Sequence, residues 1–152
     1  MATTKERSGF RDQWISERHR MWGVACSATD LDFMLLEYSR AAVCGLVEYK
    51  HKFAKQGTDW NDMPRRYSTE LSYKALIKLG NTCKIPVINC KYDRELPLFT
   101  VTPLNEYASK FVRERCEMTE FQWVSLLYLI RDIRMPASDL FDKEGRLRTI
   151  VF

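Results

Sequence analysis

The chain has little that would support several common kinds of active site. It contains only two histidines, His19 and His51, and no Ser/His/Asp arrangement, glycine-rich phosphate loop or internal repeat is visible in its 152 residues. Histidine-based catalysis is therefore not expected. No apolar run approaches the ~20 residues of a membrane-spanning helix, and the N-terminus lacks the apolar region of a signal peptide. We expect a soluble, cytoplasmic protein with no membrane partner.

Cysteine is present, but in no pattern that suits a metal site or a disulfide framework. The cysteines are odd in number and widely spaced, without a CxxC motif or a Cys/His cluster: Cys26, Cys44, Cys83, Cys90 and Cys116. This pattern predicts reduced core residues and no structural zinc. The hydrophobic content of 45% is enough for one globular domain over residues 1–152. The net charge of +4 is mildly basic and compatible with nucleic-acid binding.

Two apolar runs of strand length, residues 30–38 and 43–50, carry charges where a buried strand would have Val or Ile. The polar stretch between them, residues 39–42, predicts a hairpin connection. If the turn is centred near Arg40, residues equally far before and after this position along the chain are paired in the antiparallel hairpin. The sequence therefore predicts a β-hairpin with charged side chains at its open end.

The predicted pairing brings charged residues together on one face of this hairpin. It sets Asp32 opposite Glu48 and Asp30 opposite Lys50, with the Cβ atoms of opposed residues about 5 Å apart. Carboxylates so close repel one another and are costly to desolvate. A hard divalent cation bound by oxygen ligands would relieve this repulsion. The cluster therefore predicts a metal site.

The spacing of these charges resembles a known motif. Asp32, followed sixteen positions later by Glu48-x-Lys50 at the end of an apolar strand, is similar to the PD-(D/E)XK nuclease superfamily. Asp30 to Asp32 stands where that motif has Pro-Asp, and the proline is absent, so either aspartate fits the key ligand position. We favour Asp32, because the predicted register faces it toward Glu48. The resemblance covers about residues 10–92.

The resemblance implies a metal-dependent nuclease that hydrolyses phosphodiester bonds of DNA with Mg²⁺ or Mn²⁺. The implied ligands are the two aspartates, Glu48 and a main-chain carbonyl: Asp32, Glu48, Tyr49 and Asp30. Lys50, on the same face as Glu48, would orient or help deprotonate the attacking water. Asp30 is either a further ligand or a partner of Lys50.

A glutamate of the first helix often completes the acidic cluster in this superfamily, and Glu17 matches it by order. A helix is expected over residues 5–20, with Glu17 on the same face as Trp14 and Met21. The alternative is a partly solvated glutamate that pairs with Arg18 or Arg20.

Cationic side chains near the acidic site suit a polyanionic partner. The candidates for contact with nucleic acid are two arginines of the first helix and four residues after the hairpin: Arg18, Arg20, Lys52, Lys55, Arg65 and Arg66. An acidic pocket with a cationic rim favours a phosphodiester backbone whose scissile phosphate approaches the metal. The alternative is an ordinary solvated loop and helix end.

The remaining pattern predicts an α/β fold (α+β mixed sheet), with a restriction-endonuclease-like αβββαβ core and two additional C-terminal helices. A first short strand is expected at residues 21–26, and a helix over 68–79, closed by Gly80, leads to a strand at 85–92. This strand should lie parallel to strand 43–50. The last expected elements are a strand at 98–102 and helices at 106–115 and 119–134, the latter with a buried stripe that includes Phe121.

Two other functions compete with the nuclease. The chain fits a catalytically silent nuclease-fold module that binds nucleic acid or a host protein, and a phage or mobile-element origin suits either function. A purely structural reading, in which Lys50 neutralises its carboxylate neighbours, needs no substrate. Substrate shape and the choice between DNA and RNA stay open, and a homodimer is expected if both strands of a duplex are cut in one encounter.

Overall fold

A computed structural model describes most of the chain and divides it into two compact units, Met1–Asp30 and Leu31–Phe152. The described residues are 13–22, 31, 33–51, 67–93, 95 and 97–148. In the first unit, helix α1 spans Gln13–Met21, which overlaps the helix predicted at residues 5–20 and ends one residue later. Met21 is helical rather than the first residue of a strand, and the rest of the strand predicted at 21–26, after the turn at Trp22, lies outside the described residues.

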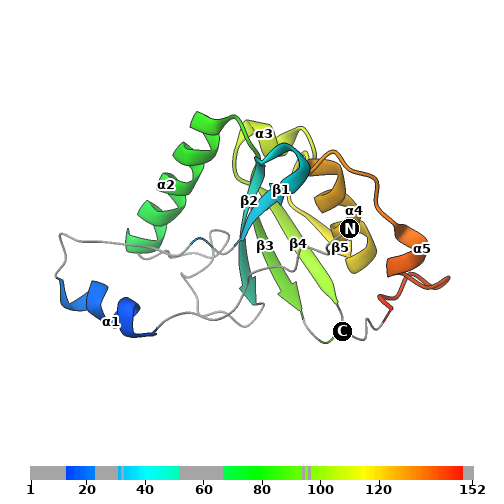
Figure 1. Cartoon of the computed structure of the whole chain (residues 1–152), viewed down its shortest axis with the longest axis horizontal. Helices are drawn as coiled ribbons and strands as arrows, with labels where there is room; N and C mark the ends of the chain where they lie inside the picture. The colour runs from blue at the N-terminus through cyan, green and yellow to red at the C-terminus, as the bar shows by residue number, and fades with distance from the viewer. Residues whose placement is uncertain are drawn as a thin grey trace. The chain divides into compact units, whose positions relative to one another are not determined.

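The second unit contains a five-stranded mixed sheet in the order β1-β2-β3-β4-β5 (Figure 1). The strands are β1 (Phe33–Glu37), β2 (Ala42–His51), β3 (Val87–Asp93), β4 (Leu98–Pro103) and β5 (Cys116–Thr119). Only the β2–β3 pair is parallel, and the other neighbours are antiparallel. The parallel pair is joined by helix α2 (Tyr67–Cys83), which confirms the predicted βαβ unit and the mixed α/β class.

The β1–β2 hairpin follows the predicted register where the structure describes it. Phe33 pairs with Val47 and Leu35 pairs with Gly45. The two residues of each pair lie equally far along the chain from Arg40, as predicted for a turn centred there. A bulge between Leu35 and Leu36 shifts the register by one residue nearer the turn. The predicted pairing therefore holds toward the open end of the hairpin.

The connection of the hairpin is a single 3-10 turn, η1 (Tyr38–Arg40), followed by Ala41 with a left-handed φ of 49°. The carboxylate of Glu37 caps this turn, because its Oε1 accepts hydrogen bonds from the Ser39 amide at 2.9 Å and the Ser39 hydroxyl at 2.7 Å. These bonds favour the charged carboxylate and lower the pKa of Glu37. A carboxylate thus holds the turn that sets the hairpin register.

Helix α2 does not end at Gly80 as predicted, and it continues to Cys83. Lys84, with φ 57°, takes the left-handed position, and the amides of Lys84 and Ile85 bond back to the carbonyls of Asn81 and Gly80. Gly80 instead allows the helix to pack closely against β3. A Cβ there would lie 2.1 Å from Cγ2 of Val87, so the helix approaches β3 too closely for any side chain.

The two faces of the sheet are covered by different helices (Figure 1). Helix α2 lies on one face, and helices α4 (Glu120–Ile130) and α5 (Ala137–Leu140) lie on the other. The main cluster of buried side chains lies on the α4 side and joins three strands to α4 and to the segment 108–112: Val47, Ile88, Cys90, Val101, Ala108, Val112, Trp123, Leu126 and Ile130. The α2 face is therefore the side of the sheet that holds less of the apolar core.

The C-terminal helices differ from their predicted bounds. The helix predicted at 106–115 is the short α3 (Glu106–Ser109), and the four-residue strand β5 follows it. Helix α4 ends at Ile130, because Asp132 adopts a left-handed φ of 54° that no α-helix continues. Phe121 is 38% exposed, and Trp123 is the buried aromatic residue of this helix.

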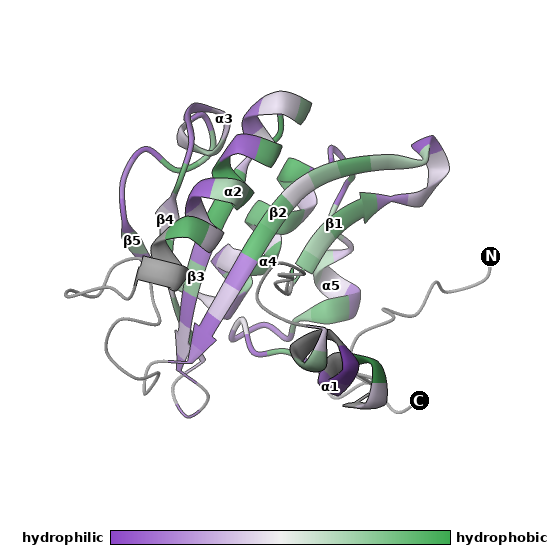
Figure 2. Cartoon of the chain, turned by 90° about the vertical axis from the view of Figure 1, so that its left-hand side faces the viewer, coloured by the Kyte–Doolittle hydropathy of each residue, from purple (hydrophilic) through white to green (hydrophobic). Residues whose placement is uncertain are grey.

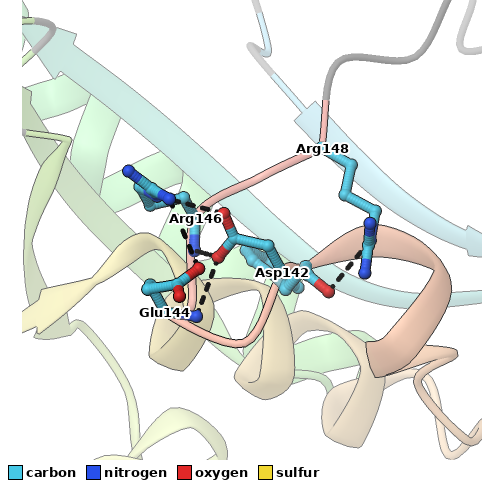
Figure 3. Close-up of polar contacts among 5 residues, drawn as sticks. Asp142, Glu144, Arg146 and Arg148 are labelled. Carbon is cyan, nitrogen blue, oxygen red and sulfur yellow. Dashed lines mark hydrogen bonds and ion pairs between the residues drawn. The ribbon is translucent and has the colours of Figure 1, made fainter.

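The chain beyond α5 is organised by Asp142 (Figure 3). Its Oδ1 accepts the amides of Glu144 and Arg146 at 3.0 and 2.8 Å, and its Oδ2 accepts Nε of Arg146 at 3.0 Å. These bonds lower the pKa of Asp142, and the bond from the Arg146 amide has the largest effect. Nε of Arg148 bonds to the carbonyls of Ser138 and Phe141, which closes the segment on α5.

Not all of the cysteines are the core residues that the sequence predicted. Cys90 is buried, Cys44 and Cys116 are partly buried, and Cys83 is exposed. Cys26 lies outside the described residues. Burial raises the pKa of the Cys116 thiol, and the nearby Glu114 carboxylate adds to this rise. None of the helices in the described residues has the length and apolar character needed to cross a membrane.

Candidate active site

The side chains of strand β2 point alternately to the two faces of the sheet. Val47 belongs to the buried cluster on the α4 side, and the ring of Tyr49 lies on that side too. Because strand side chains alternate, Glu48 and Lys50 lie on the α2 face. Figure 2 shows that the hydrophobic first part of β2 gives way to a hydrophilic C-terminal end, which lies beside the C-terminal end of β3.

Glu48 and Lys50 form an ion pair, with Nζ of Lys50 2.7 Å from Oε1 of Glu48. The two side chains are 15% and 25% exposed, so the pair is largely shielded but reachable from solvent. This contact confirms that the two residues share one face. A charged pair at the end of an otherwise apolar strand is also what the predicted active site requires.

Tyr49, between them, fixes the strand on the opposite face. Its hydroxyl accepts a hydrogen bond from Nε1 of Trp123 at 3.1 Å, and its ring packs edge-on against Phe33, Tyr92 and Trp123. Aromatic pairs of this kind add packing energy beyond the area that they bury. The side chain of Tyr49 thus anchors the backbone that carries Glu48 and Lys50.

The neighbouring strand contributes polar residues that the sequence analysis did not select. In the parallel register, Asn89 is the partner of Glu48 and Lys91 is the partner of Lys50. Asn89 is fully buried, and its Oδ1 accepts a hydrogen bond from the hydroxyl of Tyr73 on α2 at 3.2 Å. The polar residues at positions 89 and 91 were a visible signal, but the register that pairs them with Glu48 and Lys50 was not.

Several predicted site residues lie outside the described residues, namely the two aspartates and the loop cations: Asp30, Asp32, Lys52, Lys55, Arg65 and Arg66. Glu17 and Arg18 lie on α1 in the first unit, both exposed, and the guanidinium of Arg18 lies 4.9 Å from the ring centroid of Trp14. Arg20 is also in α1. The roles of all these residues stay predictions.

The described part of the predicted metal site has the right donor chemistry for Mg²⁺ or Mn²⁺. Glu48 offers a carboxylate and Tyr49 a main-chain carbonyl, and both are the oxygen donors that such hard ions prefer. Within residues 33–51, 67–93 and 97–148, no group of three or more His, Cys, Asp or Glu side chains could share a metal ion. A complete site would therefore need the predicted aspartates.

Comparisons with models of protein families, with curated proteins and with solved structures found no match.

Proposed function

We propose that the chain is a metal-dependent nuclease that hydrolyses phosphodiester bonds of DNA. The observation that carries this proposal is the Glu48–Lys50 pair, which lies on one face at the polar end of β2. A Glu-x-Lys pair of this kind, at the end of a hairpin strand, is the pattern on which the resemblance to PD-(D/E)XK nucleases rests.

The arrangement of elements supports the proposal. The order β1, β2, α2 and β3, with β2 and β3 parallel, corresponds to the ββαβ part of the αβββαβ core that the resemblance implies. The described hairpin also follows the register that predicts Asp32 opposite Glu48. This correspondence is specific, because a shift of one residue would reverse the faces of all these side chains.

The chemistry follows from the charges. A Mg²⁺ ion held by Glu48, the Tyr49 carbonyl and the predicted aspartates would polarise the phosphoryl group and lower the pKa of a bound water. The Lys50 ammonium would orient the attacking water and would balance negative charge that develops on the phosphoryl oxygens. The hydroxyl of Tyr73 donates a hydrogen bond to Oδ1 of Asn89, the register partner of Glu48, and this bond links α2 to β3 beside Glu48.

The test is a cleavage assay on supercoiled plasmid and on linear, branched and single-stranded DNA, with Mg²⁺, Mn²⁺ or EDTA. The wild type should cut at least one of these substrates only with metal, and Glu48→Gln and Lys50→Ala should both abolish cutting. Glu144→Gln and Lys143→Ala make the same charge changes in the exposed C-terminal loop and should cut like the wild type. Circular dichroism checks that each variant is folded.

Two outcomes would favour the competing functions. Binding of DNA without cutting, by a folded protein in every metal tested, would favour a silent nucleic-acid-binding module. The absence of both binding and cutting, with the Lys50–Glu48 pair still contributing to stability, would make the pair a structural feature of the sheet.

A further inference from the structure

Strand β5 forms one edge of the sheet, and this edge is open within the part of the chain that the structure describes (Figure 1). The strand pairs with β4 on one side, and no described strand pairs with it on the other. It contains no proline, so no amide is missing from the open edge. An open strand edge of this kind can pair with a strand of another chain.

A groove beside this edge adds apolar surface. It lies between β5 and α4, has a volume of about 400 Å³ and is lined by residues of both elements, including Met118, Leu126 and Leu129. Leu129 is 61% exposed although it belongs to this lining. A chain that pairs with β5 would run along the opening of the groove and would cover part of this surface.

The charges at the start of β5 limit which chain can pair there. Arg115 directly precedes the strand and Glu117 is its second residue; both are exposed, and neither forms an ion pair with a described residue. Cys116, between them, packs against the buried cluster on the α4 side. An added antiparallel strand should therefore have a basic residue opposite Glu117, an apolar residue opposite Cys116 and an acidic residue opposite Arg115.

Strand β5 itself has this order of residues. In an antiparallel pair of two copies, the partner's Arg115 can lie opposite Glu117, and the partner's Glu117 can lie opposite Arg115. We propose that β5 pairs with β5 of a second copy about a two-fold axis at Cys116, so that the two sheets become one. The same charge contact is then made twice, as in other two-fold interfaces. This inference goes beyond the proposed nuclease function and does not depend on it.

The other possible registers match the charges less well. Opposed residues of neighbouring strands share a face, so the axis of a symmetric antiparallel pair passes at a residue and not between two residues. An axis at Glu117 would set two glutamates opposite each other, which destabilises a sheet. An axis at Met118 would set Glu117 opposite the partner's Thr119. Among the axis positions within β5, that at Cys116 alone pairs opposite charges.

Sedimentation equilibrium of the full chain, without DNA or metal, measures the association. The wild type should form a dimer with twice the 18.0 kDa mass of the chain. Arg115→Glu and Glu117→Arg each set two like-charged pairs across the axis and should each raise the dimer Kd about tenfold. The double variant restores opposite charges and should return to within about threefold of the wild-type Kd. Lys143→Glu and Glu144→Arg make similar charge reversals in the C-terminal loop and should leave the Kd unchanged.

Thiol cross-linking tests the position of the axis. At the proposed axis the Cβ atoms of the two Cys116 residues lie about 5 Å apart, whereas an axis at Met118 would separate them by about 13 Å along the strands. In a variant with Cys26, Cys44 and Cys83 changed to serine, a bifunctional thiol reagent that spans about 5 Å should link two chains through Cys116. The same variant with Cys116→Ser should give no linked dimer.

Three results would overturn the inference. A monomer at every concentration tested would leave the β5 edge to a different partner. A dimer whose Kd does not respond to either charge reversal at β5 would mean that another surface holds the two chains together. A dimer that is not linked through Cys116 would rule out this axis. None of these results depends on cleavage, so the proposed function is tested separately.

Discussion

Nζ of Lys50 lies 2.7 Å from Oε1 of Glu48, two residues before it on β2. The contact places both side chains on the α2 face, while Tyr49 between them is held by Trp123 on the opposite face. The pair is therefore fixed by packing on one side of the sheet and presented on the other. A reactive pair needs this geometry, in which packing on one face of the sheet holds the backbone rigid and the charged groups on the other face stay accessible to solvent.

The ion pair should contribute measurably to stability. A double-mutant cycle with Lys50→Met, Glu48→Gln and the combined variant should give a coupling energy of about 1 kcal/mol, because the pair is short but retains some solvent contact. Urea unfolding of the four proteins provides the measurement. A coupling near zero would mean that the pair does not stabilise the folded state.

The Tyr73–Asn89 hydrogen bond should stabilise the packing of α2 on the sheet. Tyr73→Phe removes one bond to a fully buried amide oxygen and should cost about 1 kcal/mol of unfolding free energy. The urea midpoint should fall while the slope of the transition stays the same. Tyr107→Phe, on the short α3, is the matched control and should change the midpoint less.

Gly80 should tolerate no side chain, although it lies inside a helix. Gly80→Ala gains about 1 kcal/mol of helix propensity, but its Cβ would lie 2.1 Å from the stiff, buried side chain of Val87. Overpacking of this kind costs about 1–3 kcal/mol, so we expect net destabilisation. Lys84→Gly relieves a left-handed residue at the end of the same helix and should raise the melting temperature. If Gly80→Ala and Lys84→Gly changed the melting temperature in the same direction, this role of Gly80 in packing would be wrong.

The hairpin turn should weaken in acid. Hydrogen bonds from Ser39 lower the pKa of Glu37, so its stabilising effect is complete above the ordinary glutamate pKa and is lost as the pH falls through the lowered value. Melting temperatures from about pH 6 down to pH 3 should therefore fall more steeply for wild type than for Glu37→Gln. Ser39→Ala removes the main cause and should flatten the curve in the same way. Parallel curves for all three proteins would rule out this role for Glu37.

The features that the sequence predicted correctly come from local patterns. The hairpin register followed from two apolar runs around a short polar connection, and the parallel β2–β3 pair followed from a strand–helix–strand order. The position of Glu48 and Lys50 on one face needed only strand alternation. Each of these inferences uses residues close together in the chain or a rule of connection that holds for nearly all folds.

The features that it missed depend on contacts between distant segments. Gly80 resembles a helix end in the sequence, and only the approach of Val87 shows why glycine is needed there. The alignment of Lys91 with Lys50 depends on the register of a parallel pair, which the length of the crossover does not fix. Strand β5 has four residues after a charged segment, too few for a clear alternation.

The role of Glu48 in catalysis is best measured by the cleavage rate constant of Glu48→Gln relative to wild type, with Mg²⁺ and with protein in excess over DNA. We expect a loss of about a hundredfold or more, with little change in DNA affinity measured in EDTA. A variant that cuts as fast as the wild type while remaining folded would contradict this role, because Glu48 would then take no part in the reaction.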